Sequence, residues 1–122
     1  MMILIVDDSK SMRMIVLQAL KLAGLGDYRT LEAENGREAL RLVKAFHPDL
    51  VISDWQMPEM QGIDLLRRLR ESGCTVLFGF ITSESDSARR EEALAAGASF
   101  VITKPLTSRS FERVLKPLLA EI

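Results

Sequence analysis

Three acidic residues follow two short apolar runs, where they could support metal and phosphoryl chemistry. Asp7 and Asp8 end the run 2–6, and Asp54 comes just after the run Leu50–Ile52. If both runs are strands of one parallel sheet, the carboxylates meet at one edge and repel one another unless a proton or a cation lies among them. Mg²⁺ suits such a site because it prefers oxygen ligands and is usually held by one or two carboxylates together with phosphate oxygens. A carboxylate is also an established covalent nucleophile, so Asp54 is our candidate phosphoryl acceptor.

A hydroxyl and a positive charge follow two later apolar runs. Thr82 follows the run 76–81, and Lys104 follows the run 99–103. A hydroxyl donor and a cation suit the oxygens of an incoming phosphoryl group and the charge that develops during its transfer. Each residue also has a plain structural interpretation, since the acids could cap a helix or shape a turn and Lys104 could be a solvated surface charge. The meeting of all of them at one sheet edge favours the functional interpretation.

The elements that must position these residues are five strands alternating with five helices. The apolar runs predict strands at 2–6, 28–33, 50–52, 76–81 and 99–103, and the segments between and after them have helical spacing or helix-forming composition. That alternation predicts an α/β fold with a parallel sheet and helices on both faces. The strand order must reverse somewhere and leave a crevice, although periodicity does not reveal the order itself.

Buried helix faces follow from the same spacing. The predicted core stripes are Met12, Ile15, Val16, Ala19, Leu20 and Ala23; Ala39, Leu40, Val43 and Phe46; Ile63, Leu65, Leu66 and Leu69; and Phe111, Val114, Leu115, Leu118, Leu119 and Ile122. Arg70 is expected on the outer face. The segment 85–96 has no clean stripe and should be loosely anchored. Gly79 should weaken its strand. The last helix should kink and continue past Pro117, because the apolar register continues beyond it.

Size and composition limit the possible functions. A chain of 122 residues with 16 basic and 17 acidic side chains fits one domain and has no basic block for a nucleic-acid backbone. No apolar run approaches the roughly 20 residues of a membrane span, and no signal-peptide pattern opens the chain, so we expect a cytoplasmic protein. Cys74 is the single cysteine and is expected to be a reduced structural thiol, and His47 is assigned no role.

Five short motifs carry a resemblance to a known family: Val6-Asp7-Asp8-Ser9, Ser53-Asp54-Trp55-Gln56-Met57-Pro58 with Gly62, Ile81-Thr82-Ser83, Gly97-Ala98 and Lys104-Pro105. With these motifs the sequence resembles the response-regulator receiver family, most closely the single-domain chemotaxis regulators of the CheY type. The resemblance covers essentially the whole chain, which is expected to be one receiver domain over residues 1–122. It implies a flavodoxin-like (βα)5 three-layer sandwich whose parallel sheet has the order 2-1-3-4-5.

The resemblance also implies a site and a function. Asp54 would be the phosphoacceptor, Asp8 a direct Mg²⁺ ligand, Asp7 a water-mediated one and the Gln56 backbone carbonyl a further ligand. Thr82 and Lys104 would bind phosphoryl oxygens. The protein would then be a phosphorylation-dependent switch of a two-component system and not a conventional enzyme. The resemblance suggests chemotaxis or motility as its pathway.

Its partners would be a sensor histidine kinase or phosphotransfer protein, and a target that docks on the fourth helix, fifth strand and fifth helix. The chain is expected to be a monomer or a weak phosphorylation-dependent dimer.

Three alternatives stay open at this point. The chain could be a receiver domain from a larger regulator. It could be a small aspartyl-phosphate phosphohydrolase, although such enzymes place the nucleophile in an Asp-x-Asp after the first strand and carry a substrate cap, whereas Asp7 and Asp8 are adjacent here. A flavodoxin-like FMN binder would need a phosphate-binding loop and flanking aromatic residues that the sequence does not provide.

One position departs from the family pattern. Three residues before Lys104, where such receivers usually carry Tyr or Phe, this chain has Val101, and Phe100 is expected to face the other side of the sheet. A β-branched side chain has few χ1 choices and cannot swing between exposed and buried positions. The switch is therefore expected to depend on displacement of the fourth helix and of the loop that follows Thr82. Trp55, directly after Asp54, should report Mg²⁺ binding in its fluorescence.

Overall fold

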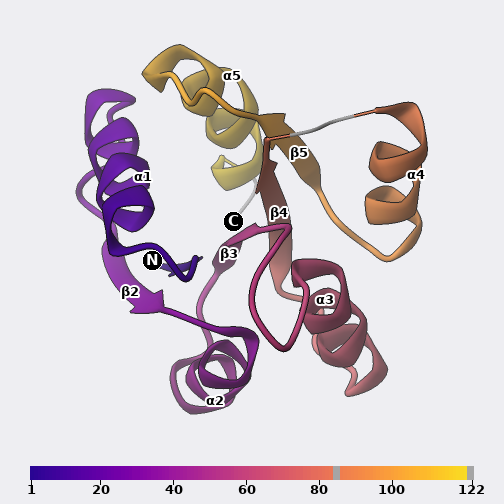
Figure 1. Ribbon diagram of the computed structural model, residues 1–122. Coiled ribbons are helices and arrows are strands. Elements are labelled where there is room, and N and C mark those ends of the chain that lie inside the picture. The colour runs from indigo at the N-terminus through magenta and orange to yellow at the C-terminus, as the bar shows by residue number, and fades with distance from the viewer. Residues whose placement is uncertain (84–85, 121–122) are drawn as a thin grey trace.

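The computed structural model describes residues 1–83 and 86–120. In this part of the chain, strands and helices alternate strictly (Figure 1): β1 (Met2–Val6), α1 (Lys10–Leu22), β2 (Arg29–Ala33), α2 (Gly36–Phe46), β3 (Leu50–Asp54), α3 (Gly62–Glu71), β4 (Leu77–Thr82), α4 (Ser87–Ala95), β5 (Phe100–Thr103) and α5 (Ser108–Leu119). All four strand pairings are parallel, and the sheet order is β2-β1-β3-β4-β5. The flavodoxin-like order 2-1-3-4-5 is therefore confirmed.

The sheet is the middle of three layers. Helices α1 and α5 cover one face, and α2, α3 and α4 cover the other (Figure 1). Along β1 the side chains alternate between these two cores, because Ile3 and Ile5 pack toward α1 and α5 while Leu4 and Val6 pack toward α2 and α3. A strand with both faces covered must be apolar at successive positions, which explains the continuous apolar runs. Among the described residues, no helix has the length and apolar character needed to cross a membrane.

Two predicted core residues lie on the surface instead. Ile15 of α1 is 50% exposed and Phe46 of α2 is 51% exposed, so their assignment to buried stripes was wrong. Phe46 is the last residue of its helix, and Ile15 lies at the edge of its stripe. Met14 and Leu22 of α1 are also more than half exposed, and with Ile15 they give α1 an apolar outer surface.

Arg70 is half-buried, and its placement on the outer face of α3 was also wrong. Its guanidinium donates to the carbonyls of Cys74 and Gly97 at 3.0 and 2.9 Å. The side chain thereby ties the end of α3 to the turn after α4. Cys74 is free and half-buried, as expected for a structural thiol.

One sequence prediction about each of the last two helices is confirmed, and the kink expected at Pro117 stays a prediction. Ala93 is the only buried residue of α4, all of which the structure describes, so this helix has little apolar anchoring. Helix α5 continues through Pro117 to Leu119, which is buried, so the predicted continuation past the proline is confirmed. Leu118 is half-buried, and Ile122 lies outside the described residues.

Gly79 contributes differently from the sequence prediction, which treated it only as a weak point of β4. A Cβ at this position would collide with three ring atoms of Phe100, the residue beside it on β5. The missing side chain therefore makes room for a buried aromatic ring. Glycine in a strand interior often marks such a close approach.

We expect Gly79→Ala to lower the free energy of unfolding by about 1–3 kcal/mol, the usual cost of overpacking a core, because the Phe100 ring must shift. Urea denaturation of the variant measures this loss. The double variant Gly79→Ala/Phe100→Leu should regain part of it, since the smaller side chain leaves room for the new methyl group. Equal stability of Gly79→Ala and the unchanged protein would contradict the packing argument.

Candidate metal and phosphoryl site

The three predicted acids meet at the carboxyl edge of the sheet. Asp7 and Asp8 follow β1, and Asp54 is the last residue of the neighbouring strand β3. The Asp7 amide donates to the Ala33 carbonyl at 3.1 Å, which extends the strand pairing by one residue and holds Asp7 beside the strand ends. One carboxylate oxygen from each of the three acids lies within 4.8 Å of the others. This oxygen-only donor set fits a hard divalent cation such as Mg²⁺.

Lys104 reaches the same edge from β5. Its amide donates to the Thr82 carbonyl at 2.8 Å, and its Nζ lies 3.7 Å from Asp54 Oδ1. The peptide bond between Lys104 and Pro105 is cis. An open depression of about 470 Å³ lies over these groups and is lined by Asp8, Asp54, Gln56, Met57, Pro58, Gln61, Ser83 and Lys104. The predicted site residue Gln56 is thus at the same edge.

Electrostatics at this edge favour a bound cation. Burial raises the pKa of Asp7 to about 6, and the charges of Asp54 and Asp8 add to the rise while the Ser9 amide and Lys104 oppose it. Burial also raises the pKa of Asp54, with Lys104 as the largest opposing influence. Both shifts show that the carboxylate charges are poorly solvated where they lie. A cation between them would restore the ionised forms.

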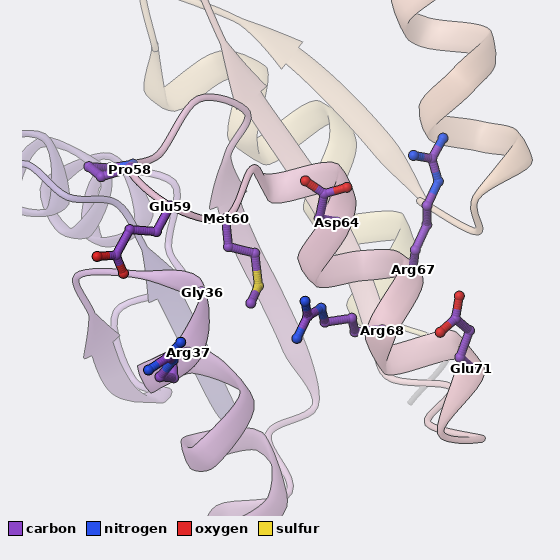
Figure 2. A pocket seen from close by; sticks show the side chains of 9 residues that line it. All are labelled: Gly36, Arg37, Pro58, Glu59, Met60, Asp64, Arg67, Arg68 and Glu71. Atoms are coloured by element: carbon purple, nitrogen blue, oxygen red, sulfur yellow. The ribbon is translucent and has the colours of Figure 1, made fainter.

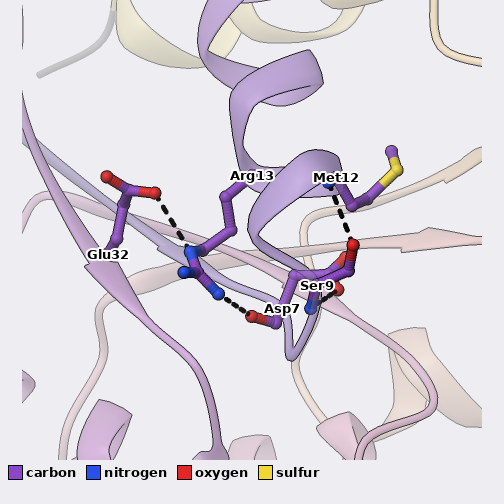
Figure 3. Close-up of polar contacts among 5 residues, drawn as sticks. All are labelled: Asp7, Ser9, Met12, Arg13 and Glu32. Atoms are coloured by element: carbon purple, nitrogen blue, oxygen red, sulfur yellow. Dashed lines mark hydrogen bonds and ion pairs between the residues drawn. The ribbon is translucent and has the colours of Figure 1, made fainter.

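The loop from β1 into α1 is held by a polar network (Figure 3). Asp7 Oδ1 accepts a hydrogen bond from the Ser9 amide at 2.9 Å, and Ser9 Oγ caps α1 by accepting from the Met12 amide at 3.2 Å. Arg13 Nη1 donates to the Asp7 carbonyl at 2.7 Å while its Nε pairs with Glu32 at 3.0 Å. The Asp7 main chain is therefore fixed from both sides. Arg13 was not identified from the sequence. Its position one turn into the helix that follows Asp7 and Asp8 could have indicated this contact.

The main chain at Asp54 is equally confined. Its carbonyl accepts from Ser53 Oγ at 2.8 Å, and a Cβ on Gly62 would collide with the same carbonyl oxygen. The Gly62 amide donates to the Trp55 carbonyl at 2.8 Å, which closes the loop 55–61 back onto the strand end. Glycine at position 62 thus lets α3 begin directly against the end of β3.

Thr82 is placed differently from the other predicted site residues. It is only 2% exposed and is not among the described residues that line the depression. Its Oγ1 lies 3.4 Å from Arg89 Nη1 of α4. The Arg89 guanidinium also lies over the Trp55 ring, 5.1 Å from its centroid, and Trp55 is buried against Phe80 with ring centroids 4.7 Å apart. Sequence reasoning left Arg89 for solvent or a partner and so missed both contacts.

A second hollow, of about 350 Å³, lies between α2 and α3 (Figure 2). The Met60 side chain points into this hollow. Arg67 points away from it toward α4, where its guanidinium pairs with the Glu92 carboxylate at 3.0 Å. Three basic and three acidic side chains line it, namely Arg37, Arg67, Arg68, Glu59, Asp64 and Glu71. Because these charges balance, the hollow has no evident preference for an ion of either sign, and the chemistry is better placed at the carboxyl edge of the sheet.

Comparison with known proteins agrees with this fold. The model of the response regulator receiver domain family matches residues 3–116. The chain is 38% identical to phosphate regulon transcriptional regulatory protein PhoB of Pseudomonas aeruginosa over 96% of its own length but only 51% of the relative's. It is 39% identical to chemotaxis protein CheY-3 of Vibrio cholerae, covering all of this chain and 94% of that one.

The solved structure of chemotaxis response regulator CheY4 of Vibrio cholerae superimposes with a TM-score of 0.81 at 31% identity, over 99% of this chain and 98% of that chain. The chain therefore belongs to the response regulator receiver domain family. It is a signalling domain of the two-component type and not a conventional enzyme. The chain spans about half the length of PhoB.

Proposed function

We propose that this domain is a phosphorylation-dependent switch in which Asp54 accepts a phosphoryl group in a Mg²⁺-dependent reaction. The observation that carries the proposal is the meeting of carboxylate oxygens from Asp7, Asp8 and Asp54 within 4.8 Å, with Lys104 Nζ at 3.7 Å from Asp54. Two acids that follow β1 and a lysine that follows β5 converge on the Asp54 carboxylate at the end of β3. Such a constellation suits transfer to that carboxylate, because phosphoryl transfer depends mainly on positioning and charge stabilisation.

In the proposed reaction an ionised Asp54 oxygen forms a bond to phosphorus while the bond to the donor's leaving group breaks, and the leaving group keeps the electron pair. Lys104 binds a phosphoryl oxygen and offsets its negative charge, and Thr82 donates its hydroxyl to another. Asp8, Asp54 and the Gln56 carbonyl would hold Mg²⁺ directly, with Asp7 acting through a water molecule. When bound, the ion would neutralise charge on the acids and on the transferring group. The domain would thus catalyse its own phosphorylation and later dephosphorylation.

The proposed partners follow from the family and from the surface. A histidine kinase or phosphotransfer protein would supply the phosphoryl group, and the exposed apolar side chains Met14, Ile15 and Leu22 on α1 offer a surface for such a protein. A target protein would dock on the face formed by α4, β5 and α5, where Leu94 is 51% exposed. Regulators named for chemotaxis and for transcription are both among the relatives, and the extent of similarity to CheY-3 favours chemotaxis or motility.

We further propose that residues 1–122 form one receiver domain that acts in the cytoplasm, as a monomer or a weak phosphorylation-dependent dimer. The alternative of a receiver within a larger regulator is supported by PhoB, of which the match covers 51%. Sedimentation of the protein with and without beryllofluoride, a mimic of the phosphoryl group, separates the monomer from the dimer.

The direct test uses acetyl phosphate. With Mg²⁺ present, intact-mass measurement should show one added phosphoryl group per chain, stable in acid and labile in base. Excess EDTA should remove the labelling, because the ligands then hold no cation. A protein that releases inorganic phosphate rapidly from small esters and never retains a phosphoryl group would favour the phosphohydrolase alternative.

A further inference from the structure

Arg89 links α4 to the carboxyl ends of β3 and β4, close to Asp54. It lies in the first turn of α4, where its amide donates to the Asp86 carboxylate at 2.7 Å, so the helix cap fixes its main chain. From there Nη1 donates to Thr82 Oγ1 at 3.4 Å, and the guanidinium lies over the Trp55 ring. Trp55 directly follows Asp54 in the chain. One side chain of α4 therefore touches the neighbour of the phosphoacceptor and the hydroxyl expected to bind phosphoryl.

These contacts matter because α4 has little apolar anchoring. Ala93 is its only buried residue, in a helix that the structure describes completely. The ion pair between Glu92 and Arg67 joins side chains that are 45% and 48% exposed, so solvent screens it strongly. The Arg89 guanidinium instead contacts a buried aromatic ring and a buried hydroxyl, where interactions are stronger. The position of α4 thus depends substantially on Arg89.

The aromatic coupling expected from the family pattern has no counterpart at β5. Val101 is 7% exposed and lies in the same core as Phe80 and Ala93, while Phe100 belongs to the opposite core, as its strand position predicted. A valine cannot turn between surface and core as a tyrosine can. Coupling between Asp54 and α4 must therefore use a different side chain. Arg89 is itself part of α4 and contacts Trp55, the residue after Asp54, and Thr82.

Thr82 connects this arrangement to phosphorylation. To donate to a phosphoryl oxygen on Asp54, its hydroxyl must turn toward the depression, which it does not line at present. A χ1 change that carries Oγ1 toward Asp54 moves it away from α4, since the staggered positions are far apart. The hydrogen bond at 3.4 Å, already long, would then be lost.

We propose that Arg89 is a positioning residue that holds Thr82 and α4 in the arrangement of the unphosphorylated protein. This inference rests on the proposed function. Phosphoryl on Asp54 releases α4 by drawing the Thr82 hydroxyl away from the guanidinium. The resting contacts therefore oppose phosphoryl binding. Their removal should shift the equilibrium toward the phosphorylated arrangement, by an amount equal to the free energy that they contribute to the resting state.

The first test is the apparent affinity for beryllofluoride, titrated by NMR with Mg²⁺ and fluoride in excess. Arg89→Lys keeps the charge, but a compact ammonium cannot contact the Thr82 hydroxyl and the Trp55 ring at the same time. This variant should therefore bind beryllofluoride about threefold tighter than the unchanged protein. Arg89→Met should bind beryllofluoride about fivefold tighter than the control variant Arg90→Met. The control removes the same charge from the same turn of α4, but the Arg90 side chain contacts the Val101 carbonyl instead. A role limited to stabilising the fold would lower affinity or leave it unchanged. Either of those results in both Arg89 variants overturns the proposal.

The second test is the emission of Trp55, the only tryptophan in the chain. Beryllofluoride should change this emission in the unchanged protein and in Arg90→Met, because the cation leaves the ring, and should change it little in Arg89→Met. A full response in Arg89→Met overturns the inference. Failure of the proposed function gives a different result, since the unchanged protein would then bind no beryllofluoride at all.

Discussion

Asp54→Asn will carry no phosphoryl group after incubation with acetyl phosphate and Mg²⁺. An amide nitrogen or oxygen is a far poorer nucleophile than a carboxylate. The other two acids lie on the loop between β1 and α1, where Asp8 is exposed and the Asp7 carboxylate is held by the Ser9 amide. The loss should exceed about 10³-fold in labelling rate, as expected when the nucleophile itself is removed. Intact-mass measurement against time gives the rate directly.

The matched control is Asp49→Asn, at the opposite end of the same strand. Asp49 accepts a hydrogen bond from the Met2 amide at 2.8 Å, and an asparagine carbonyl can do the same, so this variant should label like the unchanged protein. If Asp54→Asn still acquires a base-labile phosphoryl group, Asp54 is not the acceptor. Peptide mapping of that product would then identify the residue that is.

Asp7→Asn will make the metal-free protein more stable near neutral pH. The folded state raises the pKa of Asp7 from 3.8 to about 6. Between these values the folded protein therefore binds more protons at this site than the unfolded chain does, so the free energy of unfolding falls as pH rises through this window. Replacing the carboxyl with a neutral amide removes that loss. We expect a gain on the order of 1–2 kcal/mol above pH 6, smaller than full linkage predicts because solvent screens part of the interaction.

Thermal denaturation in EDTA across this range measures the effect. The gain of Asp7→Asn over the unchanged protein should be small below about pH 4, grow up to pH 6 and then level off. Asp64→Asn, on the exposed face of α3, removes one acid away from the cluster and should show no such growth. Mg²⁺ should stabilise the unchanged protein more than Asp7→Asn, because binding to the folded state adds stability. A gain that falls with rising pH would contradict the assigned shift.

The sequence alone determined the architecture and the edge of the sheet where the candidate site lies. Strands that are covered on both faces must be apolar at successive positions, which explains the runs at 50–52 and 76–81. Because strands alternate with helices along the chain, right-handed crossovers produce a parallel sheet. Parallel strands end on one side, so Asp54 and Lys104 had to share an edge. The strand order 2-1-3-4-5 came from the family resemblance, because periodicity has no information about which strands are neighbours.

Only the tertiary structure decided how individual side chains are used. Ile15 and Phe46 satisfy the helical spacing yet are exposed, because a stripe is buried only where a neighbouring element covers it. The role of Gly79 depends on the Phe100 ring that packs over it, and the contacts of Arg89 with Thr82 and Trp55 join three segments of the chain. Such contacts depend on the three-dimensional meeting of residues far apart in sequence. Local spacing predicts which face of an element is apolar, but not which side chain of another element will lie against it.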